Sequence, residues 1–592
     1  MSGFAALVMR HRDDQASEQG VAMLDILHAR GPNWRQSVTL DRVTLCQTGD
    51  HRAHADLTSG HGPRAAIRCI GDIRIDDRVA FLNGLAMAGR VIDPQLPDTT
   101  LIAHAYDLWQ ERLLDYLIGD FSFVVWDEAR QQLFAARDPF GVAQLFVAES
   151  ANGTVLTNTL DAALQLDGLD QSLDDTALQD CALFGYFLDP AMTPYRSIRR
   201  IAPGHAVLLR DGMRHDRRYW LPAALPPVSS ERDHLALADG FRTLFDAAVA
   251  DRVRDIDAAG IQLSGGMDST SIAATITTLA ARDKPQFALR AYTMHNETLY
   301  DDQEFVLARL VADHLGIAIE GLGPEVGAQF ANGGAPAVPS EPGPADAPGW
   351  HDVNKRTVAF APLLFMGFGG DALFEWGTPS LQSAGRWFRR REWRAGARDV
   401  RSLVGQAART LSRGRGAELP ALEWLHPDLR ARASARMAEA HRRSARGIDG
   451  MATAPLWQAI FQRSDPGYHG LPLKPAFPFF DVRLFAFMQQ VPARELGRGK
   501  LLLRTAMAER LPRQILQRPK TTLPPDLGRR SLMLHGIAPW QRDVLASAAI
   551  RDWVEPKWLA RTESGAIEEQ AEAVGPLNAA MNLAYWLSSK RR

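Results

Sequence analysis

Residues 261–272 read Ile-Gln-Leu-Ser-Gly-Gly-Met-Asp-Ser-Thr-Ser-Ile, a stretch in which an apolar run stops at two glycines and a helical pattern begins. A loop that leaves a strand and opens a helix directs several backbone N–H groups at one point, where the helix dipole adds positive potential. Gly265 and Gly266 let the backbone approach an anion closely, and the hydroxyl groups of Ser264 and Ser269 add donors. The stretch therefore predicts a phosphate-binding loop.

This loop is not of the common nucleotide-binding kind, because it lacks the Gly-x-x-x-x-Gly-Lys-Ser pattern whose lysine addresses the β- and γ-phosphates. Its Ser-Gly-Gly-x-Asp-Ser pattern resembles the pyrophosphate loop of the ATP-pyrophosphatase superfamily. That resemblance implies cleavage of ATP between the α- and β-phosphates, with adenylation of a substrate and release of pyrophosphate. The alternative is a glycine-rich turn between a strand and a helix that binds no ligand.

Two aspartates are candidates for a magnesium site. Asp268 lies in the loop, and Asp371 ends a second apolar run that closes on glycines, at residues 363–371. A hard cation that bridges phosphates prefers carboxylate oxygen. We therefore predict that Asp268 and Asp371 bind Mg²⁺; for Asp371 the alternative is a buried turn residue.

The first part of the chain is predicted to be mostly β. Within residues 99–160 a helical pattern is followed by short strands separated by turn residues, which predicts antiparallel hairpins. The strands are expected at residues 121–126, 132–137, 144–148 and 154–157.

The second part of the chain has a different period. From residue 235 onward helices and strands alternate, which predicts a parallel α/β sheet. At 592 residues the chain is too long for one domain, and we expect one domain at residues 1–220 and another at 230–592. Residues 386–415 hold ten arginines among aromatic residues, which indicates either a solvated helix face or a surface that docks a peptide or a partner.

Composition excludes several classes of function. The net charge is −2, which gives no indication of a nucleic-acid or membrane partner. The three cysteines, Cys46, Cys69 and Cys181, show neither metal-ligand spacing nor a disulfide framework. There is no secretory signal pattern and no apolar run near the roughly 18 residues that span a membrane, so a cytoplasmic protein is expected.

Together these motifs resemble the asparagine synthetase class B superfamily over nearly the whole chain. The first-half motifs are Gly119–Phe123, Trp126-Asp127 and Ala136–Gly141. The second-half motifs are Ser264–Ser269, Tyr300–Gly316, Gly367–Asp371, Pro478–Asp481, Lys500–Arg504, Leu511-Pro512 and Arg518–Lys520. The resemblance implies an Ntn-type glutamine amidotransferase-like sandwich, followed by a parallel α/β ATP-pyrophosphatase domain (adenine nucleotide alpha hydrolase-like) with a helical C-terminal part.

The resemblance also implies site residues. Lys520 matches the family's catalytic lysine near the α-phosphate, where it would neutralise charge during adenylate formation and amide closure. Lys500 is a second candidate catalytic cation, and a structural partner of a carboxylate is its alternative. The residues expected to bind ATP are Leu263, Ser264, Gly265, Gly266, Asp268, Ser269, Met294, Gly369 and Gly370.

The first half departs from the glutamine-using members of this family. Those members carry a nucleophilic cysteine directly after the initiator methionine, where this chain has Ser2. Their oxyanion asparagine corresponds to Ile70, which cannot donate a hydrogen bond. Their Arg-Gly-Pro-Asp segment reads Arg-Gly-Pro-Asn at residues 30–33. We predict that glutaminase activity is lost and that this domain remains as a scaffold.

Without ammonia from glutamine, the amine has to come from the substrate itself. In this loss the chain is similar to β-lactam synthetases, carbapenam synthetases and lasso peptide macrolactam synthetases. The β-lactam-forming enzymes place a tyrosine where this chain has Phe368, which cannot transfer a proton. The additional residues 322–349 and 386–447 suit a peptide substrate.

These arguments predict an ATP- and Mg²⁺-dependent lasso peptide cyclase. It would adenylate an Asp or Glu side chain of a processed precursor peptide and let the peptide's N-terminal amine close an isopeptide ring. A leader peptidase and a leader-binding protein are candidate partners. The alternatives are an amide-forming enzyme of β-lactam or asparagine type that acts on a small molecule, and a non-catalytic subunit that presents a peptide to a protease.

Overall fold

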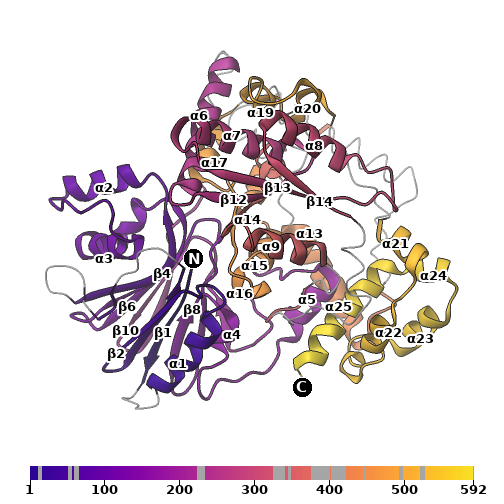
Figure 1. Cartoon of the computed structure of the whole chain (residues 1–592). Helices are drawn as coiled ribbons and strands as arrows, with labels where there is room; N and C mark the ends of the chain where they lie inside the picture. The colour runs from indigo at the N-terminus through magenta and orange to yellow at the C-terminus, as the bar shows by residue number, and fades with distance from the viewer. Residues whose placement is uncertain are drawn as a thin grey trace.

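The computed structural model describes most of the chain, whose first half forms two antiparallel sheets and whose second half forms one parallel sheet and a helical C-terminal part (Figure 1). The described residues are 1–10, 16–50, 56–58, 60, 66–222, 234–323, 340–343, 348–374, 400–401, 422–443, 447–491, 498–519 and 527–590. Lys520, residues 223–233 at the predicted domain boundary and nearly all of residues 386–415 lie outside these ranges.

The first half contains a six-stranded and a five-stranded antiparallel sheet. The six-stranded sheet has the order β2 (Trp34–Leu40), β3 (Val43–Gly49), β1 (Ser2–Met9), β8 (Gly153–Thr157), β7 (Phe146–Glu149), β9 (Ile198–Arg200). The five-stranded sheet has the order β11 (Met213–Arg218), β10 (His205–Arg210), β6 (Gln132–Arg137), β5 (Gly119–Asp127), β4 (Ile67–Ile75).

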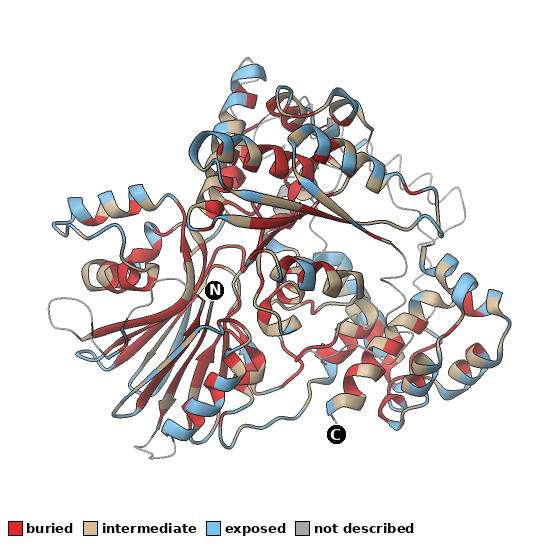
Figure 2. Ribbon diagram, in the orientation of Figure 1, coloured by how far each residue is buried: buried red, intermediate tan, exposed pale blue. Residues whose placement is uncertain are grey.

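Apolar residues at alternate positions hold the two sheets face to face. Phe4 and Ala6 of β1 pack with Val124 of β5 and Val147 of β7 in one buried cluster between the sheets. The outer face of the five-stranded sheet is covered by α2 (Arg78–Met87) and α3 (Asp98–Trp109), and that of the six-stranded sheet by α1 (Ala16–Leu27), α4 (Leu160–Ala163) and α5 (Asp175–Phe184). Buried residues accordingly run along most of these strands (Figure 2), and the predicted sandwich is confirmed.

The predicted run of hairpins is wrong at one point. β5 pairs with β6 and β7 pairs with β8, both antiparallel, but β6 and β7 belong to different sheets. The turn at Asp138 carries the chain from one sheet to the other, and the Asp138 carboxylate accepts hydrogen bonds from the backbone N–H groups of residues 140–143 at 2.8–3.1 Å. Turn residues marked the break between strands but not the change of sheet.

The second half contains a five-stranded sheet in which all neighbours are parallel, as predicted. Its order is β14 (Ala318–Leu322), β13 (Ala288–Met294), β12 (Ala258–Gln262), β15 (Leu363–Phe365), β16 (Lys474–Ala476). From the central β12 the chain proceeds to β13 and β14 on one side and then to β15 and β16 on the other. The carboxyl end of β12 is therefore the switch point at which such sheets bind ligands.

Helices surround this sheet and form the C-terminal part. Those that connect or follow the strands are α6 (His234–Val253), α7 (Met267–Asp283), α8 (Glu304–Leu315), α9 (Pro348–Val358), α10 (Gly370–Phe374), α13 (Pro427–Arg443), α14 (Gly447–Thr453), α15 (Leu456–Arg463), α16 (Pro466–His469), α17 (Val482–Gln490), α19 (Leu501–Ala506) and α20 (Arg513–Gln517). The last helices are α21 (Leu527–His535), α22 (Pro539–Leu545), α23 (Pro556–Ser564), α24 (Ile567–Glu572) and α25 (Val574–Lys590). None of the helices in the described ranges is long and apolar enough to cross a membrane.

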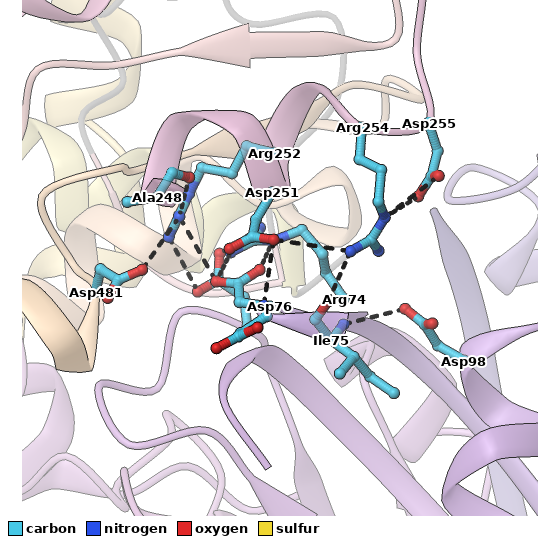
Figure 3. A network of polar contacts seen from close by, with 12 residues as sticks. Arg74, Ile75, Asp76, Asp98, Ala248, Asp251, Arg252, Arg254, Asp255 and Asp481 are labelled. Carbon is cyan, nitrogen blue, oxygen red and sulfur yellow. Dashed lines mark hydrogen bonds and ion pairs between the residues drawn. The ribbon is translucent and has the colours of Figure 1, made fainter. Parts of the chain in front are cut away.

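A buried ionic network joins the two halves (Figure 3). The Arg252 guanidinium of α6 is 3.6 Å from Asp76 and 3.6 Å from Asp120 of the first half, and 3.8 Å from Asp481, which caps α17. Arg74 pairs with Asp76 and Asp120 at 2.7 Å. Because all of these side chains are nearly excluded from solvent, each charge depends on its partners, and the first half supports the second through this contact.

Candidate active site

The loop that follows β12 is closed by two serine hydroxyls. The backbone N–H of Ser264 donates to Ser269 Oγ at 3.0 Å, and the two hydroxyl oxygens are 3.0 Å apart. The N–H of Gly266 donates to Ser264 Oγ at 3.2 Å, and α7 begins at the next residue. The sequence folds this way because short hydroxyl side chains can satisfy the N–H groups of a tight loop before a helix.

One N–H group of the loop already binds a carboxylate. Gly265 N–H donates to Glu304 Oε2 at 3.0 Å, and Glu304 Oε1 accepts a hydrogen bond from Arg518 at 3.1 Å. Glu304 is the first residue of α8, on the neighbouring β-α unit. The loop thus binds an anionic oxygen in this structure, as a phosphate-binding loop should.

The two predicted metal ligands meet at one lysine. Lys500 Nζ is 2.6 Å from both carboxylate oxygens of Asp268 and 2.6 Å from Asp371 Oδ1. Lys500 has the left-handed backbone conformation, with φ of 60°, and the preceding carbonyl of Gly499 accepts a 2.6 Å hydrogen bond from Arg504. The sequence hypothesis that Lys500 partners a carboxylate describes this arrangement, in which one ammonium neutralises two carboxylates.

Glycine is required where the second glycine-rich turn meets the loop. A Cβ at Gly370 would collide with the Asp268 carboxylate. Gly369 has φ of +92°, and a Cβ there would lie 2.6 Å from the Phe480 ring. Both glycines therefore allow Asp371 and Asp268 to approach the same point.

A cavity of about 1290 Å³ opens at this edge of the sheet. The predicted site residues that line it are Leu263, Ser264, Asp268, Ser269, Met294, Gly369 and Asp371. Gly265, Gly266 and Gly370 belong to the same two turns, and Lys500 joins the site through its carboxylate partners. Lys520 lies outside the described residues, and its role remains a prediction. The structure thus brings together eleven of the twelve predicted site residues.

Comparison with known proteins identifies the family. The family model for asparagine synthase matches residues 240–588, more than half of the chain, and a glutamine amidotransferase domain model matches residues 1–220.

The chain belongs to the asparagine synthase family. A putative glutamine-hydrolyzing asparagine synthetase of Mycobacterium tuberculosis is 29% identical over 273 residues, which cover 45% of this chain and 37% of that protein. Glutamine-hydrolyzing asparagine synthetase 3 of Bacillus subtilis is 36% identical over 183 residues, 30% of this chain and 28% of that protein. The Bos taurus asparagine synthetase is 27% identical over 332 residues, 51% of this chain and 53% of that protein. The chain thus aligns with less than two thirds of each of these relatives.

The site fits the nucleotide and the metal that this family membership implies. Within the described part of the chain no group of three or more His, Cys, Asp or Glu side chains could hold a metal ion. Mg²⁺, however, is often held in proteins by one or two carboxylates and completes its shell with phosphate oxygens and water. Asp268 and Asp371 supply two carboxylates at one point beside the phosphate loop, where both contact the Lys500 ammonium at 2.6 Å.

In the first half Ile70 lies in the core, and Arg30 and Asp72 contact the second half. The side chain of Ile70 is fully buried in the cluster between the sheets, so its position offers no donor. Arg30 donates to Thr159 Oγ1 at 2.8 Å and forms a buried ion pair with Asp465 of the second half. Asp72 accepts a 2.8 Å hydrogen bond from Lys474, also of the second half.

Asp72 is held in its charged form. Burial raises the pKa of the Asp72 carboxyl, but the ammonium groups of Lys474 and Met1 outweigh burial and lower that pKa to about 2. Polar groups at this end of the sandwich therefore bind the second half across the junction.

Sequence reasoning missed four residues of the site. Glu304 and Arg518 contact the phosphate loop, Arg504 ties the Lys500 turn to the backbone carbonyl of Arg518 at 2.7 Å, and Trp350 lines the cavity. Arg504 and Arg518 lie in the motifs Lys500–Arg504 and Arg518–Lys520. Their positive charge beside the candidate lysines could have indicated a place in the site. Glu304 also lies in a named motif, Tyr300–Gly316, but its contact with the loop depends on packing, and Trp350 lies outside all of these motifs.

Proposed function

We propose that this chain is an ATP-dependent amide-forming ligase of the lasso peptide cyclase type. It adenylates a side-chain carboxylate of a processed precursor peptide and joins it to the peptide's own N-terminal amine, with AMP and pyrophosphate as products. The observation that carries the proposal is the cavity at the phosphate loop, whose volume of about 1290 Å³ exceeds the roughly 300–1000 Å³ of ordinary small-molecule sites. A nucleotide together with a folded peptide needs such room.

The reaction has two steps. A carboxylate oxygen of the peptide attacks the α-phosphorus of ATP, and the bond to the bridging oxygen breaks so that pyrophosphate leaves. The neutral N-terminal amine then attacks the acyl carbon, the bond to the AMP oxygen breaks, and the nitrogen releases one proton to solvent. A terminal amine has an ordinary pKa of about 7.7–8.0, so roughly a fifth to a third of it is neutral at about pH 7.4.

The chain's own groups act mainly by binding and orientation. Ser264, Gly265, Gly266 and Ser269 bind the leaving pyrophosphate, and Lys500 offsets the negative charge of Asp268 and Asp371 beside it. These two carboxylates would hold Mg²⁺, which would neutralise charge at the phosphates when bound. Lys520 is proposed to act at the α-phosphate. Holding amine and acyl group together in one fold of the peptide removes most of the entropy cost of ring closure.

The surroundings of the first half support a substrate amine in place of ammonia from glutamine. Ile70 is buried and apolar where a donor would be needed, and Arg30 and Asp72 are engaged with Asp465 and Lys474. We propose that this half is a scaffold without glutaminase activity. A leader peptidase and a leader-binding protein remain proposed partners, because they would deliver the processed peptide.

Substrate-dependent ATP–pyrophosphate exchange tests the proposal. Linear peptides with a free N-terminal amine and one internal Asp or Glu are expected to support exchange, and the same peptides with Asn or Gln at that position are not. An N-acetylated peptide should support exchange but form no ring, which separates adenylation from ring closure. Exchange with a free amino acid and with no peptide would overturn the proposal.

A further inference from the structure

One wall of the cavity is aromatic. Trp350 of α9, Phe368 of the turn after β15 and Trp457 of α15 line it. The rings of Trp350 and Phe368 are nearly parallel, with centroids 5.9 Å apart and an interplanar angle of 16°. Behind them Phe477 lies 6.3 Å from Phe368, and Phe480 packs edge-on against Trp457 at 4.9 Å. Phe477 and Phe480 are buried, whereas the three lining rings keep part of their surface exposed.

This wall stands beside the phosphate loop and the end of β13. A Cβ at Gly367 would lie 3.0 Å from the backbone nitrogen of Ser269, so the turn that carries Phe368 packs against the phosphate loop. A Cβ at Gly349 would lie 2.8 Å from Met294 Sδ, so the start of α9 packs against the end of β13. A carboxylate at the α-phosphate would therefore have Trp350 and Phe368 as neighbours.

Most of the charged residues in the described lining are acidic. Arg518 is the one residue with a guanidinium in this described lining. The residues with carboxylates are Asp268, Asp301, Asp302, Glu304 and Asp371. A second acidic side chain on the substrate would be repelled here, whereas an apolar or aromatic one would find a ring to contact.

We propose that Trp350 and Phe368 determine substrate specificity by binding an apolar or aromatic side chain of the peptide next to the activated carboxylate. The proposal rests on the proposed peptide function and adds the identity of the neighbouring residue. The wall orients the carboxylate donor, because a side chain held against the rings fixes the backbone on which the acid sits. Trp350 and Phe368 bind and orient the substrate and take part in no proton transfer.

Matched peptides test the proposal in ATP–pyrophosphate exchange with the full chain. Each peptide carries one Asp and differs only at the residue that follows it, which is Phe, Leu, Ser or Glu. We expect kcat/KM for Phe and Leu to exceed that for Ser by about tenfold, the size of one well-packed aromatic contact, and Glu to be the poorest. In Trp350→Ala the preference should fall to within about twofold while the KM for ATP is unchanged, and Trp350→Phe should retain most of it.

Trp540→Ala is the matched control. Trp540 is partly exposed and packs edge-on against Tyr585 at 6.2 Å in the C-terminal helices, and it is not among the described residues that line the cavity. The control should keep the wild-type preference. Equal use of the Phe and Ser peptides by the wild-type chain would overturn the proposal without any variant, as would an unchanged preference in Trp350→Ala. If no peptide supports exchange but a free amino acid does, the proposed function itself fails.

Discussion

Replacement of Arg252 by Met tests whether the first half supports the second. The Arg252 side chain is 1% exposed and lies within 3.8 Å of three buried carboxylates, Asp76, Asp120 and Asp481. Loss of one partner from a buried ionic cluster costs about 3–5 kcal/mol. Asp76 and Asp120 keep Arg74 as a partner, so we expect the lower end of that range, about 3 kcal/mol.

Urea unfolding followed by tryptophan fluorescence measures this loss. Arg242→Met is the matched control, because Arg242 lies on the same helix, is 31% exposed and forms a surface ion pair with Asp239 at 2.7 Å. Such a surface pair is worth about 0–1 kcal/mol. Equal free energies of unfolding for the two variants would refute the reasoning that the buried network couples the halves.

Further predictions concern the site and the junction. Lys500→Met should lower exchange by about 100-fold or more, as for loss of one electrostatic stabiliser, while circular dichroism shows a folded chain; wild-type exchange would remove Lys500 from the site. Gly370→Ala should weaken MgATP binding by about tenfold in calorimetry, because the new methyl group displaces the Asp268 carboxylate; unchanged affinity would contradict this packing. The lowered pKa of Asp72, from 3.8 to about 2, stabilises the folded state by about 2 kcal/mol above pH 4, and this is lost as pH falls through 2. The stability difference between wild type and Asp72→Asn, measured against pH, should shrink over that window, and Lys474→Met should show the same trend.

Local patterns were sufficient to predict most of the fold. The apolar run before Ser264 and the helical pattern after it gave β12 and α7, since hydrophobic period and turn chemistry are local properties. The division of β6 and β7 between two sheets was not predicted, because pairing depends on tertiary packing that a turn sequence does not encode.

The site could be predicted in part for the same reason. Asp268 and Asp371 each follow an apolar strand and glycines, and adjacent parallel strands bring such ends together. The attachment of Glu304 to the loop and of Trp350 to the cavity depends on how α8 and α9 pack, and residues far apart in sequence share no pattern. Lys520 stays a prediction from the motif alone.

Transfer of an oxygen-18 label tests the central claim most directly. A peptide whose Asp or Glu carboxylate carries the label is incubated with ATP, Mg²⁺ and the full chain, without glutamine, and the products are weighed by mass spectrometry. We expect a cyclic peptide whose mass is lower than that of the linear peptide by one water. One labelled oxygen should appear in the AMP and none in the pyrophosphate. Label in inorganic phosphate, or product formation only when glutamine is added, would contradict it.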